Sequence, residues 1–358
     1  MAVSFGVLLR CLARPFQILI SSSAQGSDRN ENEKDRKQYL DHASTLYPDA
    51  TEITPVQHQG GCSYTLRVSQ HGSNTPEKRQ DVILQFRPVQ YALDLDLARR
   101  ARETYGELAP ITRSRGRLRR NGPRMSCQAL EMSVVPGVRL SEVLPKRGEL
   151  SDHDLEKMHN LLDGLASFFL AGVAASDNRR RPRGKVGSSI PTRLQKLARE
   201  LPTASLRLQA EESLNAVRAG ALERLTVVLT HGDLLPSNIM VDAESWKLNG
   251  LVDWAESEDL PFGAALYAVE HVLGYLDVGE NGQAEWVWYQ QAQELRVFFE
   301  SRLREGLASP IRDADVRVAR DVGVLLWHGF AWDDGKIDRV VNEEDDALEL
   351  LYLRAFLE

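Results

Sequence analysis

The segment VVLTHGDLLPSNIMVDAESWKLNGLVDWAE, residues 227–256, decides how this chain is interpreted. An apolar run ends at Thr230, and a short polar stretch that contains Asp233 follows it directly. Asn238 comes five positions after Asp233, and a second apolar run leads into Asp253, twenty positions after Asp233. Short apolar runs bounded by turn residues predict strands. The three polar side chains are therefore expected on loops at strand ends.

These residue types suit one kind of chemistry. Transfer of a phosphoryl group from ATP needs positioning and charge neutralisation more than covalent help. One carboxylate has to orient the acceptor hydroxyl or amine and take its proton, while magnesium needs hard oxygen ligands. Asp233, Asn238 and Asp253 supply such a set. The alternative interpretation is that they are ordinary surface turn residues.

The motif HGDLLPSN, residues 231–238, resembles the catalytic loop H-G-D-x-x-x-x-N of aminoglycoside phosphotransferases and of the related choline and fructosamine kinases. LVDW is similar to the metal-binding strand of the same families. The resemblance implies that Asp233 is the catalytic base and that His231 braces the loop. It also implies that Asn238 and Asp253 bind Mg²⁺.

A second segment, QGGCSYTLRV at residues 59–68, resembles the hairpin that covers the nucleotide in this superfamily. Gly60 and Gly61 would let the backbone approach a phosphate closely. Ser63 would donate to that phosphate, although as a turn serine it would be equally ordinary. The full G-x-G-x-x-G pattern is absent from this segment.

The strand VILQFR, residues 82–87, departs from the family pattern. The resemblance calls for a lysine or arginine facing the α- and β-phosphates, and the aligned position holds Gln85. Arg87 lies two residues on, so its side chain faces the same side of the strand. Either Arg87 takes the role or the phosphate contact is weakened. Asp96 is the predicted acidic partner of this cation, with Glu103 as second choice.

Further similarity extends over most of residues 50–275. MSVVPGVRL, 132–140, resembles the segment that joins the two lobes, and this places Met132 at the adenine. QGGCSYTL, the QFRP run and VDWAESEDLPFG together resemble a group of fungal proteins with a phosphotransferase domain. The resemblance specifies fold and chemistry, and it leaves the acceptor open.

The order of expected elements predicts the fold class. Strands dominate up to residue 135, with one main helix over residues 91–106, whereas helices dominate after Ser151, a natural N-cap. We therefore predict an α+β, two-lobed, protein-kinase-like fold. Its parts are a disordered or targeting segment at 1–35, a nucleotide-binding lobe at 36–135, and a catalytic and acceptor-binding lobe at 136–358.

Composition excludes several classes of protein. A net charge of −7 over 358 residues argues against a nucleic-acid binder, and three scattered cysteines indicate a reducing compartment. The first twenty residues hold two arginines and no acid, which disfavours a membrane span. A cytoplasmic location is expected, with a mitochondrial transit peptide as the alternative. The oligomeric state is left open.

Three charged stretches have ambiguous patterns. The basic clusters at 113–124 and 178–185 contain Gly and Pro, and we predict exposed loops, with an anion-binding site as the alternative. Glu256, Glu258 and Asp259 follow the metal strand. They are predicted to be exposed loop acids, and the alternative is an acidic pocket for a cationic acceptor.

The function predicted from these observations is an ATP- and Mg²⁺-dependent phosphotransferase that acts on a hydroxyl or amine of a small molecule. Two rivals stay open. One is a catalytically weak kinase-fold protein that binds a nucleotide or a partner, which the glutamine at position 85 supports. The other keeps the fold and transfers a nucleotidyl group instead.

Overall fold

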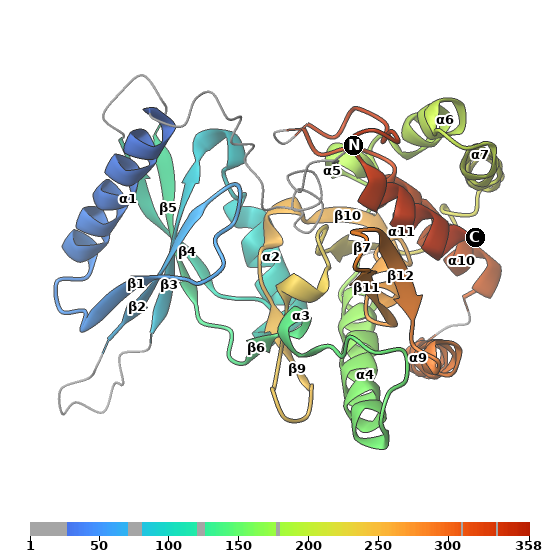
Figure 1. Cartoon of the computed structure of the whole chain (residues 1–358), viewed down its shortest axis with the longest axis horizontal. Coiled ribbons are helices and arrows are strands. Elements are labelled where there is room, and N and C mark those ends of the chain that lie inside the picture. The colour runs from blue at the N-terminus through green and yellow to red at the C-terminus, as the bar shows by residue number, and fades with distance from the viewer. Residues whose placement is uncertain (1–26, 71–80, 120–125, 177–179, 309–310, 334–335) are drawn as a thin grey trace. The chain divides into compact units, whose positions relative to one another are not determined.

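The computed structural model describes residues 27–70, 81–119, 126–176, 180–308, 311–333 and 336–358. They form two compact units. The first unit runs up to Arg100 and includes Pro110–Val134, and the second comprises Ala101–Ala109 and Val135–Glu358. The first is built on a sheet and the second is mainly helical, which confirms the predicted α+β class (Figure 1).

The first unit contains one five-stranded antiparallel sheet with the order β1-β2-β3-β5-β4. Its strands are β1 (Glu52–Pro55), β2 (Tyr64–Ser69), β3 (Val82–Pro88), β4 (Thr112–Leu118) and β5 (Cys127–Ser133). The predicted strand VILQFR corresponds to β3, and β5 lies within the stretch up to residue 135 where strands were predicted to dominate. Alternation of β-forming residues with burial on one face explains why these segments pair.

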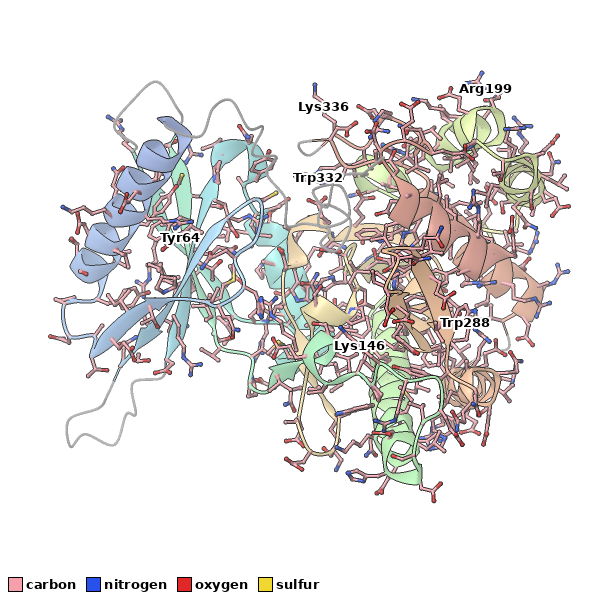
Figure 2. The ribbon with its side chains drawn as sticks, viewed as in Figure 1. Tyr64, Lys146, Arg199, Trp288, Trp332 and Lys336 are labelled. Carbon is pink, nitrogen blue, oxygen red and sulfur yellow. The ribbon has the colours of Figure 1, made fainter. Side chains whose placement is uncertain are left out.

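Helix α1 (Ser27–Leu46) covers one face of this sheet through Tyr39, Ala43 and Tyr47 (Figure 1). Tyr39 stacks on Tyr64 of β2, with ring centroids 5.3 Å apart. Figure 2 labels Tyr64 among the side chains of this unit. The helix begins inside the segment that is predicted to be disordered or targeting. The sequence did not predict this helix because its first turns are polar. Residues 1–26 lie outside the described part.

The basic cluster at 113–124 also differs from its prediction. Residues 113–118 belong to the edge strand β4, and residues 120–125 lie outside the described part. Gly116 adopts φ +91° where the register shifts, and Arg115 pairs with Glu131 of β5. A strand was missed because its arginines suit an exposed edge as well as a loop.

Helix α2 (Leu95–Tyr105) ends as its sequence predicts. Gly106 follows it with φ +57°, in the left-handed region that a helix C-terminus favours. Tyr105, its last residue, donates a hydrogen bond to the main-chain oxygen of Leu229.

The second unit carries short sheets among helices (Figure 1). Its helices are α3 (Leu140–Val143), α4 (Asp152–Ala174), α5 (Gly184–Gly187), α6 (Ile190–Glu200), α7 (Ala204–Arg218), α8 (Tyr267–Glu270), α9 (Ala292–Gly306), α10 (Asp313–His328) and α11 (Ala347–Leu357). Its strands are β6 (Val138–Arg139), β7 (Val227–Thr230), β8 (Ile239–Val241), β9 (Leu248–Leu251), β10 (Glu258–Pro261), β11 (Gly274–Val278) and β12 (Ala284–Trp288).

Two of these small sheets position the predicted catalytic segment. β7 pairs with β10, and β8 pairs with both β6 and β9. The apolar runs that end at Thr230 and before Asp253 therefore form strands, as predicted, and β8 lies between them. α4 starts with the predicted cap: Ser151 and Asp154 form a reciprocal capping box. Within the described ranges, no helix has both the length and the apolar character needed to cross a membrane.

Candidate active site

His231 is the buried anchor of the loop that follows β7. Its side chain is 0% exposed, and its Nε2 lies 2.9 Å from the main-chain oxygen of Val252. Its Nδ1 accepts a 3.3 Å hydrogen bond from the main-chain N–H of Asp233. A neutral imidazole with its proton on Nε2 satisfies both contacts. His231 therefore ties Asp233 to the strand end that precedes Asp253.

Electrostatics favours the same neutral form of His231. Burial lowers the pKa of His231 from 6.5 to about 4, although the charge of Asp253 opposes the shift. Desolvation wins because a charged imidazolium without water is costly. The ring is thus a fixed brace at neutral pH rather than a titrating acid or base.

Asn238 fixes Asp233 directly. Its Nδ2 donates to the main-chain oxygen and to the Oδ2 of Asp233, at 2.9 Å in each case. The main-chain oxygen of Asn238 accepts a 2.9 Å bond from the N–H of Val252. These hydrogen bonds link Asp233, the predicted base, through Asn238 to Val252, the residue before the predicted metal ligand Asp253.

Asp253 sits in a strained turn between β9 and the 3₁₀ turn Trp254–Glu256. Its φ and ψ are both 64°, a left-handed conformation that aspartate tolerates better than most residues. Trp254 is buried, donates to the Leu251 oxygen at 2.9 Å, and lies 4.6 Å from the His231 ring. The tryptophan packs beside His231 and holds the turn in place.

Gly232 shows why the loop needs a glycine between His231 and Asp233. Its φ is +81°, and a Cβ at this position would lie 1.7 Å from the main-chain oxygen of Glu256. Both the conformation and the close approach exclude a side chain.

The donor set is suitable for magnesium. With Nδ2 of Asn238 bound to Asp233, its Oδ1 is the atom left for a cation, and Asp253 offers carboxylate oxygens. Both are hard ligands of the kind Mg²⁺ prefers, and Mg²⁺ commonly takes only one or two carboxylates and keeps water. In the part of the chain that the structure describes, no cluster of three or more His, Cys, Asp or Glu could hold a metal.

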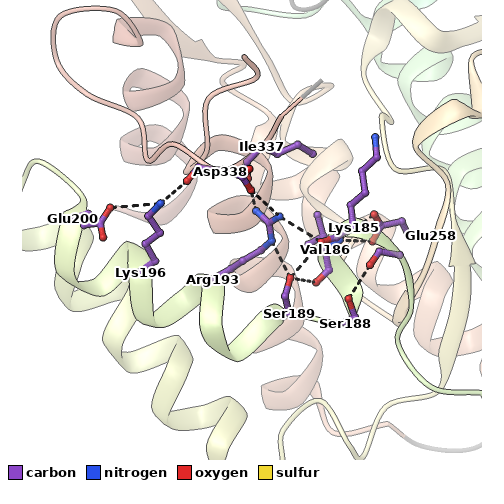
Figure 3. Close-up of polar contacts among 11 residues, drawn as sticks. Lys185, Val186, Ser188, Ser189, Arg193, Lys196, Glu200, Glu258, Ile337 and Asp338 are labelled. Carbon is purple, nitrogen blue, oxygen red and sulfur yellow. Dashed lines mark hydrogen bonds and ion pairs between the residues drawn. The ribbon is translucent and has the colours of Figure 1, made fainter. Parts of the chain in front are cut away.

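Two of the three acids that follow β9, Glu258 and Asp259, are buried and not exposed, so for these two the prediction was wrong. Glu258 in β10 is 9% exposed, and its carboxylate accepts bonds of 2.9–3.1 Å from the N–H groups of Val186 and Gly187 in α5 (Figure 3). Burial raises the pKa of Glu258, and the backbone N–H groups oppose this.

The other two acids meet the second basic cluster. Lys185 lies 3.1 Å from Glu256, and Arg180 lies 3.8 Å from Asp259. The cluster at 178–185 is predicted as a solvated loop. Most of its described residues are exposed, as predicted, and the segment also contacts β10 at Asp259, while 177–179 lie outside the described part. We call residues 180–187 the strap.

Figure 3 also shows how the strap continues into α6 and a C-terminal loop. Arg193 donates to Ser189 Oγ at 3.0 Å and to the main-chain oxygen of Ile337. Lys196 donates to the oxygen of Asp338. Polar contacts therefore run without a break from β10 to residues 337–338.

In the first unit, the residues predicted for the nucleotide also lie together. Gln85 Nε2 donates to Ser63 Oγ at 3.1 Å and to Thr65 Oγ1 at 3.3 Å. Arg87 Nη1 donates to Gln85 Oε1 at 3.2 Å, and its Nε donates to the Tyr91 oxygen at 2.8 Å. Arg87 is 4% exposed, so its guanidinium is part of the interior of the described structure.

Asp96 does not pair with Arg87, and this prediction was wrong. Its side chain is 84% exposed, and its ion pair in the described part of the chain is with Arg99, 3.6 Å away on the same helix. Position 96 lies in the first turn of α2, where an acidic residue complements the helix dipole. Glu103, the second choice, remains a prediction.

The loop before β2 depends on a residue that the sequence analysis missed. Gln59 donates to the oxygens of Val56 and Thr65 and accepts from the Thr65 N–H, at 2.8–3.0 Å. Gly60 and Gly61 lie in the turn that this side chain closes, and Ser63 N–H reaches the Gly60 oxygen at 3.5 Å. No sequence motif marks such a glutamine.

Met132 lies in β5 opposite Ile83 and Thr112.

A second residue missed from the sequence is Tyr267 of α8, whose hydroxyl accepts a 3.2 Å bond from the N–H of Leu234, next to Asp233. Tyr267 lies within the apolar run PFGAALYAVE, which is typical of ordinary core.

Comparison with known proteins bears on this geometry. The phosphotransferase enzyme family matches this chain over residues 74–287. The solved choline kinase LicA from Streptococcus pneumoniae is similar in fold, with TM-score 0.50 and 10% identity over 90% of this chain and 98% of that one. This similarity in fold agrees with the protein-kinase-like fold predicted from the sequence. The family match supports the same fold.

Two further solved structures are similar at lower scores. An aminoglycoside-3'-phosphotransferase of type VIII has TM-score 0.48 and 17% identity over 79% of this chain and 97% of that one. A choline/ethanolamine kinase family protein from Mesorhizobium loti has TM-score 0.49 and 15% identity, covering 87% and 89%. A search of the curated proteins gave no match.

Proposed function

Because the chain belongs to the phosphotransferase enzyme family, we propose that it transfers the γ-phosphoryl group of ATP to a hydroxyl or amine of a small molecule. The observation that carries the proposal is the double hydrogen bond from Asn238 to Asp233. It fixes the carboxylate of a base candidate next to an amide oxygen suited to magnesium.

Asp233 orients the acceptor group and takes its proton as the acceptor bonds to the γ-phosphorus, while the bond from that phosphorus to the bridging oxygen breaks and ADP leaves. Asn238 prevents rotation of that carboxylate, and neutral His231 holds the backbone beneath it. Preorganisation of this kind lowers the barrier because the loop has little left to order at the moment of reaction.

Magnesium would be held by Asn238 Oδ1 and by Asp253, and it would supply neutralisation of phosphate charge. The left-handed turn at Asp253 supports this role, since strained backbone is retained where it serves a site. The nucleotide would meet the first unit through Gly60, Gly61 and Ser63.

Gln85, Arg87 and Met132 complete the proposed nucleotide contacts. Gln85 is linked to both Ser63 and Arg87, so a shift of the Gly60–Gly61 turn would be felt by the arginine. Hydrogen bonds in one network polarise one another, so the charge of Arg87 would strengthen the donor that Gln85 directs toward Ser63 and the proposed phosphate.

Thermal unfolding of the purified chain with ATP, with Mg²⁺ and with both tests this function. A ligand at 100 times its Kd adds about 2.7 kcal/mol to the free energy of unfolding. Each kcal/mol is expected to raise the Tm by roughly 2–4 °C in chains near this size. The expected result is a rise that needs both ligands and is lost in Asp253→Ala. No rise at millimolar ATP and Mg²⁺ would contradict the proposal.

Turnover is then tested with a panel of small alcohols and amines, by product mass. A product heavier by one phosphate group supports the proposal, and an adenylate adduct supports nucleotidyl transfer instead. Asp233→Asn should abolish turnover and keep the ATP-dependent rise. Full activity in that variant would exclude Asp233 as the base.

A second candidate is a kinase-fold protein that binds nucleotide without efficient turnover. It is favoured by one observation: a neutral Gln85 stands where a cation is expected, and Arg87 is buried. A thermal rise with ATP and Mg²⁺ but no product from any acceptor, and no release of phosphate, would favour this candidate.

A further inference from the structure

The hydroxyl of Tyr267 supports the predicted catalytic loop from the side of the C-terminal helices. It accepts a 3.2 Å hydrogen bond from the N–H of Leu234, the residue after Asp233. Tyr267 is 4% exposed and Leu234 is 0% exposed. Since water does not reach the Leu234 N–H, this bond is the one described contact that satisfies it.

Two more side chains restrain the loop, and they do not come from α8. His231 and Asn238, which belong to the loop itself, hold the N–H, the oxygen and the carboxylate of Asp233. Tyr267 acts one residue further along, from α8. The backbone on the two sides of the Asp233 side chain is therefore held from two directions.

Helix α8 has only four residues, so its position depends on what it is attached to. Glu270 at its end is buried and pairs with Arg296 of α9 at 2.8 Å and with Arg320 of α10 at 3.1 Å. Two charge-assisted contacts to a buried carboxylate make a firm attachment. The contacts of Glu270 with α9 and α10 therefore fix the position of α8 and of the Tyr267 hydroxyl.

The ring of Tyr267 is fixed as well. It stacks on Trp327 of α10, with centroids 5.2 Å apart and planes 10° from parallel. Next to this stack, His271 Nε2 lies 3.1 Å from His328 Nε2, and His328 Nδ1 lies 2.7 Å from Glu349 of α11. This buried polar chain holds α8, α10 and α11 together.

We propose that Tyr267 is a positioning residue: its hydroxyl holds the Leu234 N–H and so fixes the orientation of Asp233 during phosphoryl transfer. The inference rests on the proposed function for its kinetic consequence, but the hydrogen bond can be tested without it. No step of proton transfer is assigned to the tyrosine. Its contribution is to restrict the loop before the acceptor binds.

Tyr267→Phe removes one oxygen and keeps the ring and its stack on Trp327. The matched control is Tyr289→Phe, which deletes an equally buried hydroxyl whose partner is the Pro145 oxygen at 2.7 Å. Both variants are expected to lower the Tm by similar amounts. A merely structural role would make them alike in every other measurement.

Mg²⁺-dependent turnover of ATP, with water or an acceptor found in the panel, gives the first comparison. Loss of one buried hydrogen bond to the loop is expected to lower kcat of Tyr267→Phe about 5- to 100-fold. The KM for ATP should stay within about twofold, and Tyr289→Phe should keep the wild-type kcat. A kcat for Tyr267→Phe equal to that of Tyr289→Phe would overturn the inference.

Hydrogen exchange of the peptide 231–238 gives the second comparison, which needs no turnover. Tyr267→Phe should speed exchange in this peptide roughly tenfold or more relative to Tyr289→Phe, because the Leu234 N–H loses its acceptor. Equal exchange in the two variants would overturn the inference. If the wild type binds ATP but shows no turnover at all, the proposed function fails, and exchange alone decides the role of Tyr267.

Discussion

Asn238 holds Asp233 at two points, with its amide nitrogen 2.9 Å from both the main-chain oxygen and the carboxylate of Asp233. One side chain thus sets both the backbone and the rotamer of the residue proposed as the base. The amide is well suited to this place because it is a donor toward Asp233 and an acceptor at its other atom.

Replacement Asn238→Asp separates these two functions. The new carboxylate keeps an oxygen for Mg²⁺, but it cannot donate, and it places like charge beside Asp233. We expect kcat to fall about 10- to 100-fold, while the Mg²⁺-dependent thermal rise with ATP persists. Asn249→Asp, at a half-buried asparagine of β9 bonded to the Pro136 oxygen, is the matched control and should leave kcat unchanged. Equal kcat values in both variants would contradict the assignment.

The buried His231 should make stability depend on pH. Its pKa is about 4 in the folded chain, against 6.5 for a histidine in water, so the unfolded state takes up the proton first as the pH falls. The contribution to unfolding free energy is complete above pH 6.5 and is lost progressively toward pH 4, by about 3 kcal/mol in all. Urea unfolding of wild type and His231→Asn between about pH 4 and 8 checks this. Parallel curves for the two proteins would show that His231 does not titrate in this way.

Two glycines with nearly the same φ allow the close approach at Gly232 to be measured. Gly232 has φ +81°, and a Cβ added there would lie 1.7 Å from a backbone oxygen, whereas Gly220 has φ +84° and its nearest neighbour, the tip of Arg224, at 3.4 Å. Gly220→Ala should cost about 1–2 kcal/mol from backbone strain alone. Gly232→Ala should cost at least about 2 kcal/mol more, because backbone must move. Equal costs in chemical denaturation would mean that the loop shifts freely.

The attachment of the strap can be tested at Glu258. Glu258→Ala leaves the N–H groups of Val186 and Gly187 without their acceptor and should lower the free energy of unfolding by about 2–4 kcal/mol. Glu258→Gln should recover most of this, since burial raises the pKa of the carboxyl and a neutral oxygen acceptor is tolerated. Glu256→Ala, which removes only the half-exposed pair with Lys185, should cost less than about 1 kcal/mol. A similar loss for both alanine variants would argue against a special role for Glu258.

The sequence predicted the strands around Asp233 well because each is a short apolar run that ends in turn residues. The capping box at Ser151 and the glycine after α2 could also be predicted, because both are local sequence signals. The positions of His231, Asn238 and Asp253 could be named for the same reason: their spacing is fixed by two neighbouring loops.

Contacts between distant segments could not be predicted in this way. The partners of Glu258 lie about seventy residues earlier in the chain, and nothing in the string NRRRPRGK says that the backbone just after it caps a carboxylate. Tyr267 and Gln59 are similar cases, because each acts through hydrogen bonds whose partners are set by the fold. Asp96 failed for the opposite reason: a residue of the right type was available on a helix face that points to solvent.

The bond between Glu258 and Val186 also bears on the order in which the chain folds. It joins two points 72 residues apart and encloses α6, α7 and β7 within one closed loop. Contacts of such long sequence separation form only after the cost of loop closure has been met, whereas α6 and α7 can form locally. The attachment of α5 to β10 should therefore form late.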